Sequence, residues 1–138
     1  MMKTRAPVGL LIGLVLLGSL PAGGRAEQGP PVPESFAQLR TNPQAYLGAA
    51  VELGGEIVRW MPSDQGFLLL VLQHPLAPTR RPDRLLLSGG WFWVEYPEQL
   101  GPPSPVAPLI TLAGEVVGTK EGTPVIRARQ VSLFSLLW

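Results

Sequence analysis

The sequence contains no cysteine and a single histidine, and both shortages limit the chemistry open to it. Without cysteine there is no disulfide framework and no thiolate nucleophile. A zinc site needs three or four nitrogen, sulfur or oxygen ligands, so one histidine argues against one. The Gly-x-Ser-x-Gly elbow and the glycine-rich phosphate loops are absent too. We therefore expect no catalytic, cofactor-binding or metal-binding residue, and we interpret His74 as a loop residue without a partner.

The ten acidic residues are scattered, and scattered acids usually lie on a solvated surface. Two related stretches, VELGGEIV (51–58) and ITLAGEVV (110–117), place Glu56 and Glu115 at the same offset. One reading is a paired acidic site. The favoured reading is that the preceding glycines, Gly55 and Gly114, mark tight corners of a small barrel and that each glutamate faces water.

The first 26 residues have the composition of a secretory signal peptide. Lys3 and Arg5 precede an apolar stretch, 8–20, that is shorter than the roughly 20 residues of an ordinary spanning helix. Gly24 and Ala26 are small at the −3 and −1 positions of a cut after Ala26. An uncleaved anchor is the alternative. A lipoprotein signal carries a cysteine where Gly24 stands, so the chain as written cannot take that lipid.

The positive charge of the chain belongs to this leader. Three of the 11 basic residues lie in it, whereas all 10 acidic residues follow it, so cleavage changes the formal charge from +1 to −2. A mildly acidic domain does not attract nucleic acid, and we expect no nucleic-acid partner.

Residues 27–33 contain three prolines and are expected to form an extended spacer before a single domain, 34–138. Ser35 is the predicted N-cap of a short helix with Phe36 and Leu39 on one face. Runs of alternating or continuous apolar residues then predict about five or six strands, at 51–59, 67–72, 85–87, 91–96, 109–117 and 125–134. The expected fold is mostly β, a small barrel of the oligonucleotide/oligosaccharide-binding type.

Two groups of residues are candidates for a ligand or partner surface. Arg80, Arg81 and Arg84 form a basic cluster, and the favoured interpretation is a solvated loop. The alternatives are a contact with lipid or lipopolysaccharide phosphates and, with the nearby tryptophans, a surface for single-stranded nucleic acid, against which export and the negative charge argue. Trp91 and Trp93 share one face of a strand that is apolar on both faces. Such a strand is either fully buried or has one face against a partner, a stacked ligand or a membrane interface.

Several motifs in order resemble the Slp family of bacterial outer-membrane lipoproteins. They are Asn-Pro-x-x-Tyr-x-Gly (42–48), Gly-Gly-Glu-Ile (54–57), Leu-Gln-x-Pro-Leu (72–76), Gly-Glu-Val-x-Gly (114–118) and Pro-Val-Ile-x-Ala (124–128). The chain departs from the family pattern at the missing cysteine and at SGGWFWVEYPEQ (88–99), which is less polar than its counterpart.

The resemblance implies a small β-barrel domain exported to the outer membrane or periplasm, with a role linked to envelope stress or starvation and no catalytic residues. The partners it implies are outer-membrane or envelope components, among them another envelope protein. We expect a non-enzymatic binding or scaffolding protein. The alternatives are a periplasmic module that binds a glycan or lipopolysaccharide and a hydrolase that uses loop carboxylates.

Overall fold

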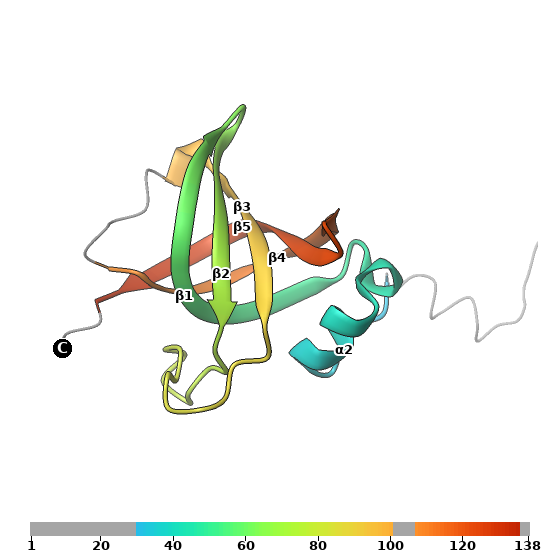
Figure 1. Ribbon diagram of the computed structural model, residues 1–138, viewed down its shortest axis with the longest axis horizontal. Helices are drawn as coiled ribbons and strands as arrows, with labels where there is room; N and C mark the ends of the chain where they lie inside the picture. The colour runs from blue at the N-terminus through green and yellow to red at the C-terminus, as the bar shows by residue number, and fades with distance from the viewer. Residues whose placement is uncertain (1–29, 101–106, 136–138) are drawn as a thin grey trace, which may run out of the picture. The chain divides into compact units, whose positions relative to one another are not determined.

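The computed structural model describes residues 30–100 and 107–135, which form a β-barrel preceded by a short helix (Figure 1). All of the secondary structure below lies within Pro31–Trp138. The predicted leader, its cut after Ala26 and the start of the spacer lie outside the described residues and stay predictions.

The short N-terminal helix begins where its cap predicts. Helix α2 (Phe36–Thr41) follows Ser35, whose side-chain oxygen accepts a hydrogen bond from the Gln38 backbone N–H at 3.2 Å. Leu39 is fully buried, and the Phe36 ring lies 5.7 Å from that of Phe92. A 3₁₀ helix, η1 (Pro43–Tyr46), then leads into the first strand.

The barrel consists of five strands: β1 (Ala50–Ser63), β2 (Gly66–Gln73), β3 (Trp91–Pro97), β4 (Leu109–Lys120) and β5 (Thr123–Phe134). A short 3₁₀ helix, η2 (Glu98–Leu100), follows β3. The strands close in the order β1-β2-β3-β5-β4, and every pairing is antiparallel except β3 with β5. This is a five-stranded Greek-key arrangement. The prediction of a small, mostly β barrel after a short helix is confirmed.

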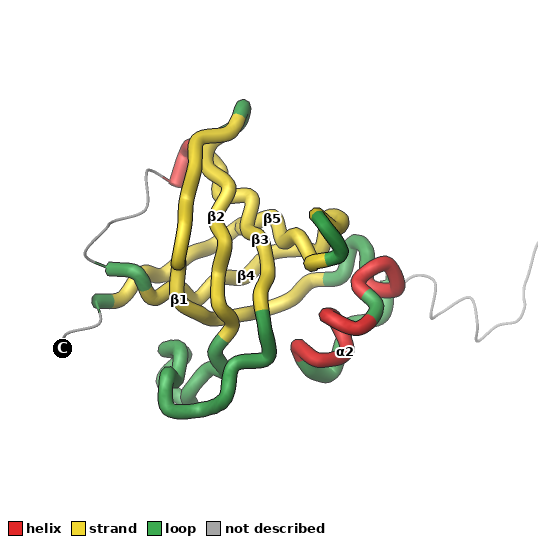
Figure 2. The backbone as a smooth tube through the Cα atoms, in the orientation of Figure 1, coloured by secondary structure: helices red, strands yellow, loops and turns green. Residues whose placement is uncertain are grey.

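Strand β1 is long and strongly curved because it pairs with two partners in turn (Figure 2). Its first half, Ala50–Glu56, pairs with β4, and its second half, Gly55–Ser63, pairs with β2. Gly55 stands where the two pairings overlap. A side chain there would collide with the Leu72 carbonyl oxygen. Gly55 is therefore a corner of the barrel, as predicted.

Gly114 occupies the second predicted corner. It adjoins a register shift between β4 and β5, and a side chain there would collide with the Arg127 backbone. Such a shift bends the strand and increases its twist. Both repeated glycines thus permit close approach of the neighbouring strand.

The predicted strand at 85–87 is wrong, because these residues lie in the loop between β2 and β3. The Asp83 carboxylate accepts a hydrogen bond from the Leu85 backbone N–H at 3.0 Å, and the Asp83 carbonyl accepts one from Leu86 at 3.3 Å. An Asx-type turn of this kind competes with strand pairing. The three leucines therefore take part in no strand pairing.

Candidate functional site

The outer face of β2 and β3 carries a row of apolar side chains. On β3, Phe92 and Val94 are fully buried in the barrel, so Trp91 and Trp93 face outward. The strand register sets Leu72 opposite Trp91 and Leu70 opposite Trp93, with Leu68 next along β2. We call Leu68, Leu70, Leu72, Trp91 and Trp93 the outer patch. These side chains point away from the barrel core, and the three leucines of the patch are partly exposed.

The two tryptophans of the patch differ in exposure. Trp91 is 44% exposed, whereas Trp93 is 7% exposed. The Lys120 ammonium lies 5.4 Å from the centre of the Trp93 ring, within the range of a cation–π contact. Trp91 is therefore the ring that a ligand or partner can reach, while Trp93 mainly completes the packing of the barrel wall.

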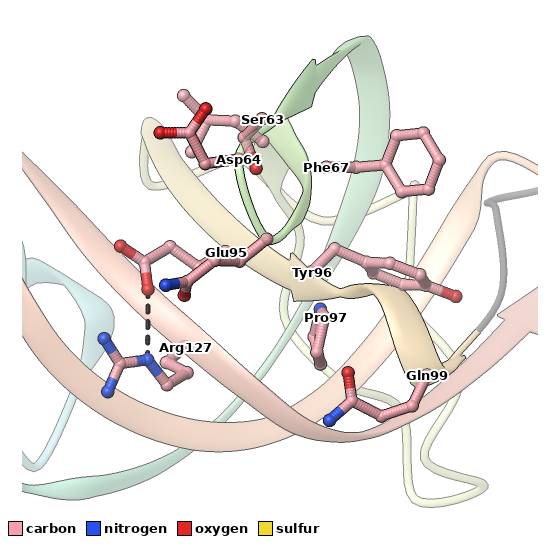
Figure 3. Close-up of a pocket in the computed structure, with 10 residues that line it drawn as sticks. Ser63, Asp64, Phe67, Glu95, Tyr96, Pro97, Gln99 and Arg127 are labelled. Atoms are coloured by element: carbon pink, nitrogen blue, oxygen red, sulfur yellow. Dashed lines mark hydrogen bonds and ion pairs between the residues drawn. The ribbon is translucent and has the colours of Figure 1, made fainter.

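A cavity of about 820 Å³ adjoins the patch at the β1–β2 turn (Figure 3). Ser63 and Asp64 line it from the turn, and Leu68 joins it to the outer patch. In Figure 3 the rings of Phe67 and Tyr96 lie on one side and the Glu95–Arg127 pair on the other. The lining thus combines aromatic rings with charged groups, which is a combination that binding sites use to orient a ligand.

Two rings, Phe67 and Tyr96, form the aromatic side of this cavity, and Trp60 packs on Phe67 without lining the cavity. Phe67 lies 5.2 Å from Trp60 and 6.4 Å from Tyr96, both nearly edge to face. Burial raises the pKa of the Tyr96 phenol above its ordinary value. The phenol therefore stays protonated at neutral pH and is a neutral wall of the site.

The charged side is an ion pair between β3 and β5. The Arg127 Nε donates to Glu95 Oε1 at 3.0 Å, and both side chains are about half exposed. Because the arginine already occupies this carboxylate oxygen, the pair suits ligand contact better than proton transfer. Among the described residues, no cluster of histidine, aspartate and glutamate could hold a metal ion.

The three arginines of the predicted basic cluster are each fastened to the barrel. Arg80 forms an ion pair with Glu52, and Arg84 Nε lies 3.6 Å from Glu56 Oε1. Arg81 donates to the Ser135 carbonyl and lies 5.2 Å from the centre of the Phe134 ring. The arginines thus tie their loop to β1 and to the end of β5, which the sequence pattern did not indicate.

The two repeated glutamates are not brought together. Glu56 is opposite Leu109 and Glu115 is opposite Ala50, at the two ends of the β1–β4 ladder. Each pairs with an arginine instead, Glu56 with Arg84 and Glu115 with Arg129. This placement agrees with the favoured interpretation, in which each glutamate follows a corner glycine and faces water. It does not agree with a paired acidic site.

His74 directly follows β2 and is 7% exposed. Its backbone N–H donates to the Gly54 carbonyl at 2.9 Å. Within the described part of the chain, neither ring nitrogen has a hydrogen-bond partner. The burial of the ring was not predicted, because nothing in the local pattern distinguishes a buried loop histidine from an exposed one.

The fold and the site define a small β-barrel that presents an apolar patch and an open, mixed cavity on one face. Residues 18–126 match the outer membrane lipoprotein Slp family, which covers most of the chain. The chain belongs to that family, and its place is the outer membrane or periplasm, to which the family is exported. No curated protein and no solved structure matches the chain significantly. No helix in the described ranges is long and apolar enough to span a membrane.

Proposed function

We propose that the protein is a non-enzymatic binding or scaffolding component of the cell envelope, and that the outer patch is its contact surface. The observation that carries this proposal is the outward row of leucines on β2 beside the half-exposed Trp91. Apolar patches of this kind, bordered by charged residues, mark interaction sites on monomeric proteins. A role in envelope stress or starvation, as the family resemblance implies, belongs to the same proposal.

The absence of enzymatic activity is part of the proposal. The Glu95 carboxylate is held by Arg127, and His74 lies away from solvent without a partner among the described residues. Neither arrangement supplies a general base with access to a substrate. A broad hydrolase screen with the purified protein should find no turnover, and sustained turnover that is lost in Asp64→Asn would contradict the proposal.

Site-specific crosslinking in the native host tests the contact surface. A photo-crosslinking residue replaces Trp91 in one strain and Leu47 in another, because Leu47 has a similar exposure, 43%, outside the patch. We expect one defined adduct from the patch position and none from the control. Equal labelling at both positions, or none at either, contradicts the patch as the contact surface.

A second candidate function is binding of a glycan, including the sugars of lipopolysaccharide, in the cavity and on Trp91. It is favoured by the combination of the half-exposed Trp91 and the partly exposed Phe67 with Asp64 and Glu95, since sugars pair ring stacking with hydrogen bonds to carboxylates. Tryptophan fluorescence is the measurement, with lipopolysaccharide core oligosaccharide and peptidoglycan fragments as probes.

The chain offers a matched control for this titration. Trp60 and Trp91 are both 44% exposed, but Trp60 lies opposite the buried Leu69, outside the outer patch. We expect a saturable fluorescence change in the parent protein and in Trp60→Phe that is lost in Trp91→Ala. A response that survives Trp91→Ala, or no response to any probe, counts against glycan binding at this face.

A further inference from the structure

The loop between β2 and β3 (74–90) contains three consecutive leucines, 85–87, that the barrel does not cover. Leu85 is 95% exposed, Leu86 51% and Leu87 94%. Single exposed leucines are common on protein surfaces, but three adjacent ones in one loop, here called the leucine tip, form a contiguous apolar surface. Figures 1 and 2 show this loop extending beyond the ends of the two strands that it joins.

The loop has a defined internal structure that holds the leucines outward. The Asp83 N–H donates to the Pro75 carbonyl at 2.8 Å, and Ala77 and Arg81 are joined by a backbone hydrogen bond of the same length. An isolated bridge pairs Leu76 with Pro82. The leucines follow directly on the turn at Asp83, and their exposure shows that the barrel does not cover them.

The arginines beside the tip fasten the loop to the barrel. Arg80 and Arg84 are ion-paired with Glu52 and Glu56 on β1. These pairs neutralise most of the positive charge near the tip. What the loop offers to a partner is therefore apolar surface rather than net charge.

We propose that Leu85, Leu86 and Leu87 insert into the lipid surface at which the protein resides and hold the barrel against it. The family places the chain at the outer membrane or periplasm. Leu85 and Leu87 are almost fully exposed and Leu86 is half exposed, so the three side chains do not all point in one direction. Lipid chains can surround side chains that point in several directions, whereas a pocket on a protein partner would have to match this one shape. The proposal goes beyond the outer patch, because it rests on other residues.

The expected strength of this contact is modest. A single acyl chain gives only marginal, reversible binding, and stable attachment takes a second signal. The sequence holds no cysteine for a lipid, which increases the importance of a contact made by side chains. The leucine tip would thus orient a protein that another segment helps to retain.

The lack of cysteine makes the test clean, since a single introduced cysteine takes a fluorophore at one place. The full chain carries an environment-sensitive label on Leu86→Cys or, as a control of similar exposure, on Leu47→Cys. Both proteins are mixed with phosphatidylcholine vesicles that contain spin-labelled lipid. We expect a blue shift and quenching for Leu86→Cys and neither for Leu47→Cys.

The leucines themselves are tested in the same assay. Adding Leu85→Ser and Leu87→Ser to the Leu86→Cys protein should weaken vesicle partitioning about a hundredfold, since each leucine loses its transfer to an apolar medium. Because both side chains are exposed, the melting temperature should not change. Equal quenching at both labels would mean that another segment brings the whole chain to the vesicle, and it would overturn the proposal.

Varying the salt concentration and the lipid charge distinguishes leucine insertion from charge attraction. Because the neighbouring arginines are paired, binding to vesicles with phosphatidylglycerol should match binding to phosphatidylcholine and should survive high salt. Quenching that appears only with anionic vesicles and disappears in salt would show charge attraction in place of leucine insertion. No quenching with any vesicle would refute lipid as the occupant.

Discussion

Replacing Gly55 by alanine tests the idea that β1 turns a corner at this residue. The added Cβ would collide with the Leu72 carbonyl oxygen and lie 2.5 Å from the Val71 Cγ1, whereas ordinary contacts begin near 3.4 Å. The missing space is almost an ångström on two sides. Neither neighbour can rotate away freely, because Leu72 and Val71 belong to β2, which is paired with β1 at this point.

Overpacking of this size costs about 3 kcal/mol. Alanine recovers about 1 kcal/mol of that through its lower conformational entropy in the unfolded chain. The net loss is about 2 kcal/mol, or roughly 8 °C in melting temperature for a domain of this size. Gly55→Val and Gly114→Val should lose at least as much, although valine is the better strand former.

Gly118 is the matched control, since it lies in β4 and a Cβ there would meet nothing within 4 Å. Gly118→Ala should raise the melting temperature by about 2–4 °C. Circular dichroism during heating measures both variants, and urea unfolding confirms the free energies. Gly55→Ala with the stability of the parent protein, or the same effect from both substitutions, would refute the corner.

Three further predictions concern stability. His74→Leu should increase the free energy of unfolding, measured in urea, by about 1 kcal/mol, because it removes two buried ring nitrogens that have no hydrogen-bond partner among the described residues. A loss of stability would show that the imidazole nitrogens do form hydrogen bonds in the folded protein. Leu39→Ala should lower that free energy by about 2–5 kcal/mol, because this fully buried side chain packs helix α2 into the core; an unchanged value would mean that the helix is not part of the folding unit. Burial raises the Tyr96 pKa above 10.0, so the stability it contributes is complete below that pH and is lost as pH rises through the folded-state pKa. Ultraviolet titration should show the Tyr96 phenol ionising at a higher pH in the folded protein than in the same protein unfolded in urea. An identical transition in both states would contradict the burial.

Much of the barrel could be predicted from local patterns. Ser35 caps the helix because its side chain can reach an N–H three residues on, a contact that depends only on nearby sequence. The repeated glycines could be identified as corners because a glycine inside an alternating apolar run usually marks a bulge or a tight bend. The predicted strand at 85–87 is wrong because three consecutive leucines are compatible with a buried strand and with an exposed loop, and no local signal distinguishes the two.

The candidate site was only partly predictable. Trp91 and Trp93 were identified as one face of a strand, which the two-residue period ensures. Their different exposures could not be predicted, because the contacts of Trp93 include Lys120, which comes from the end of β4, far along the chain. The cavity also escaped prediction, because Asp64, Tyr96 and Arg127 meet only after β1, β3 and β5 have packed.

The sequence by itself determined the local elements, the corner glycines and the family, because capping, alternation and motif order involve residues close together in the chain. The tertiary structure decided which side chains are left uncovered. The parallel pairing of β3 with β5 and the double pairing of β1 leave Trp91 half exposed and bury His74. Exposure of this kind depends on which distant segments come into contact, and hydrophobic burial is the physical force that selects among those contacts.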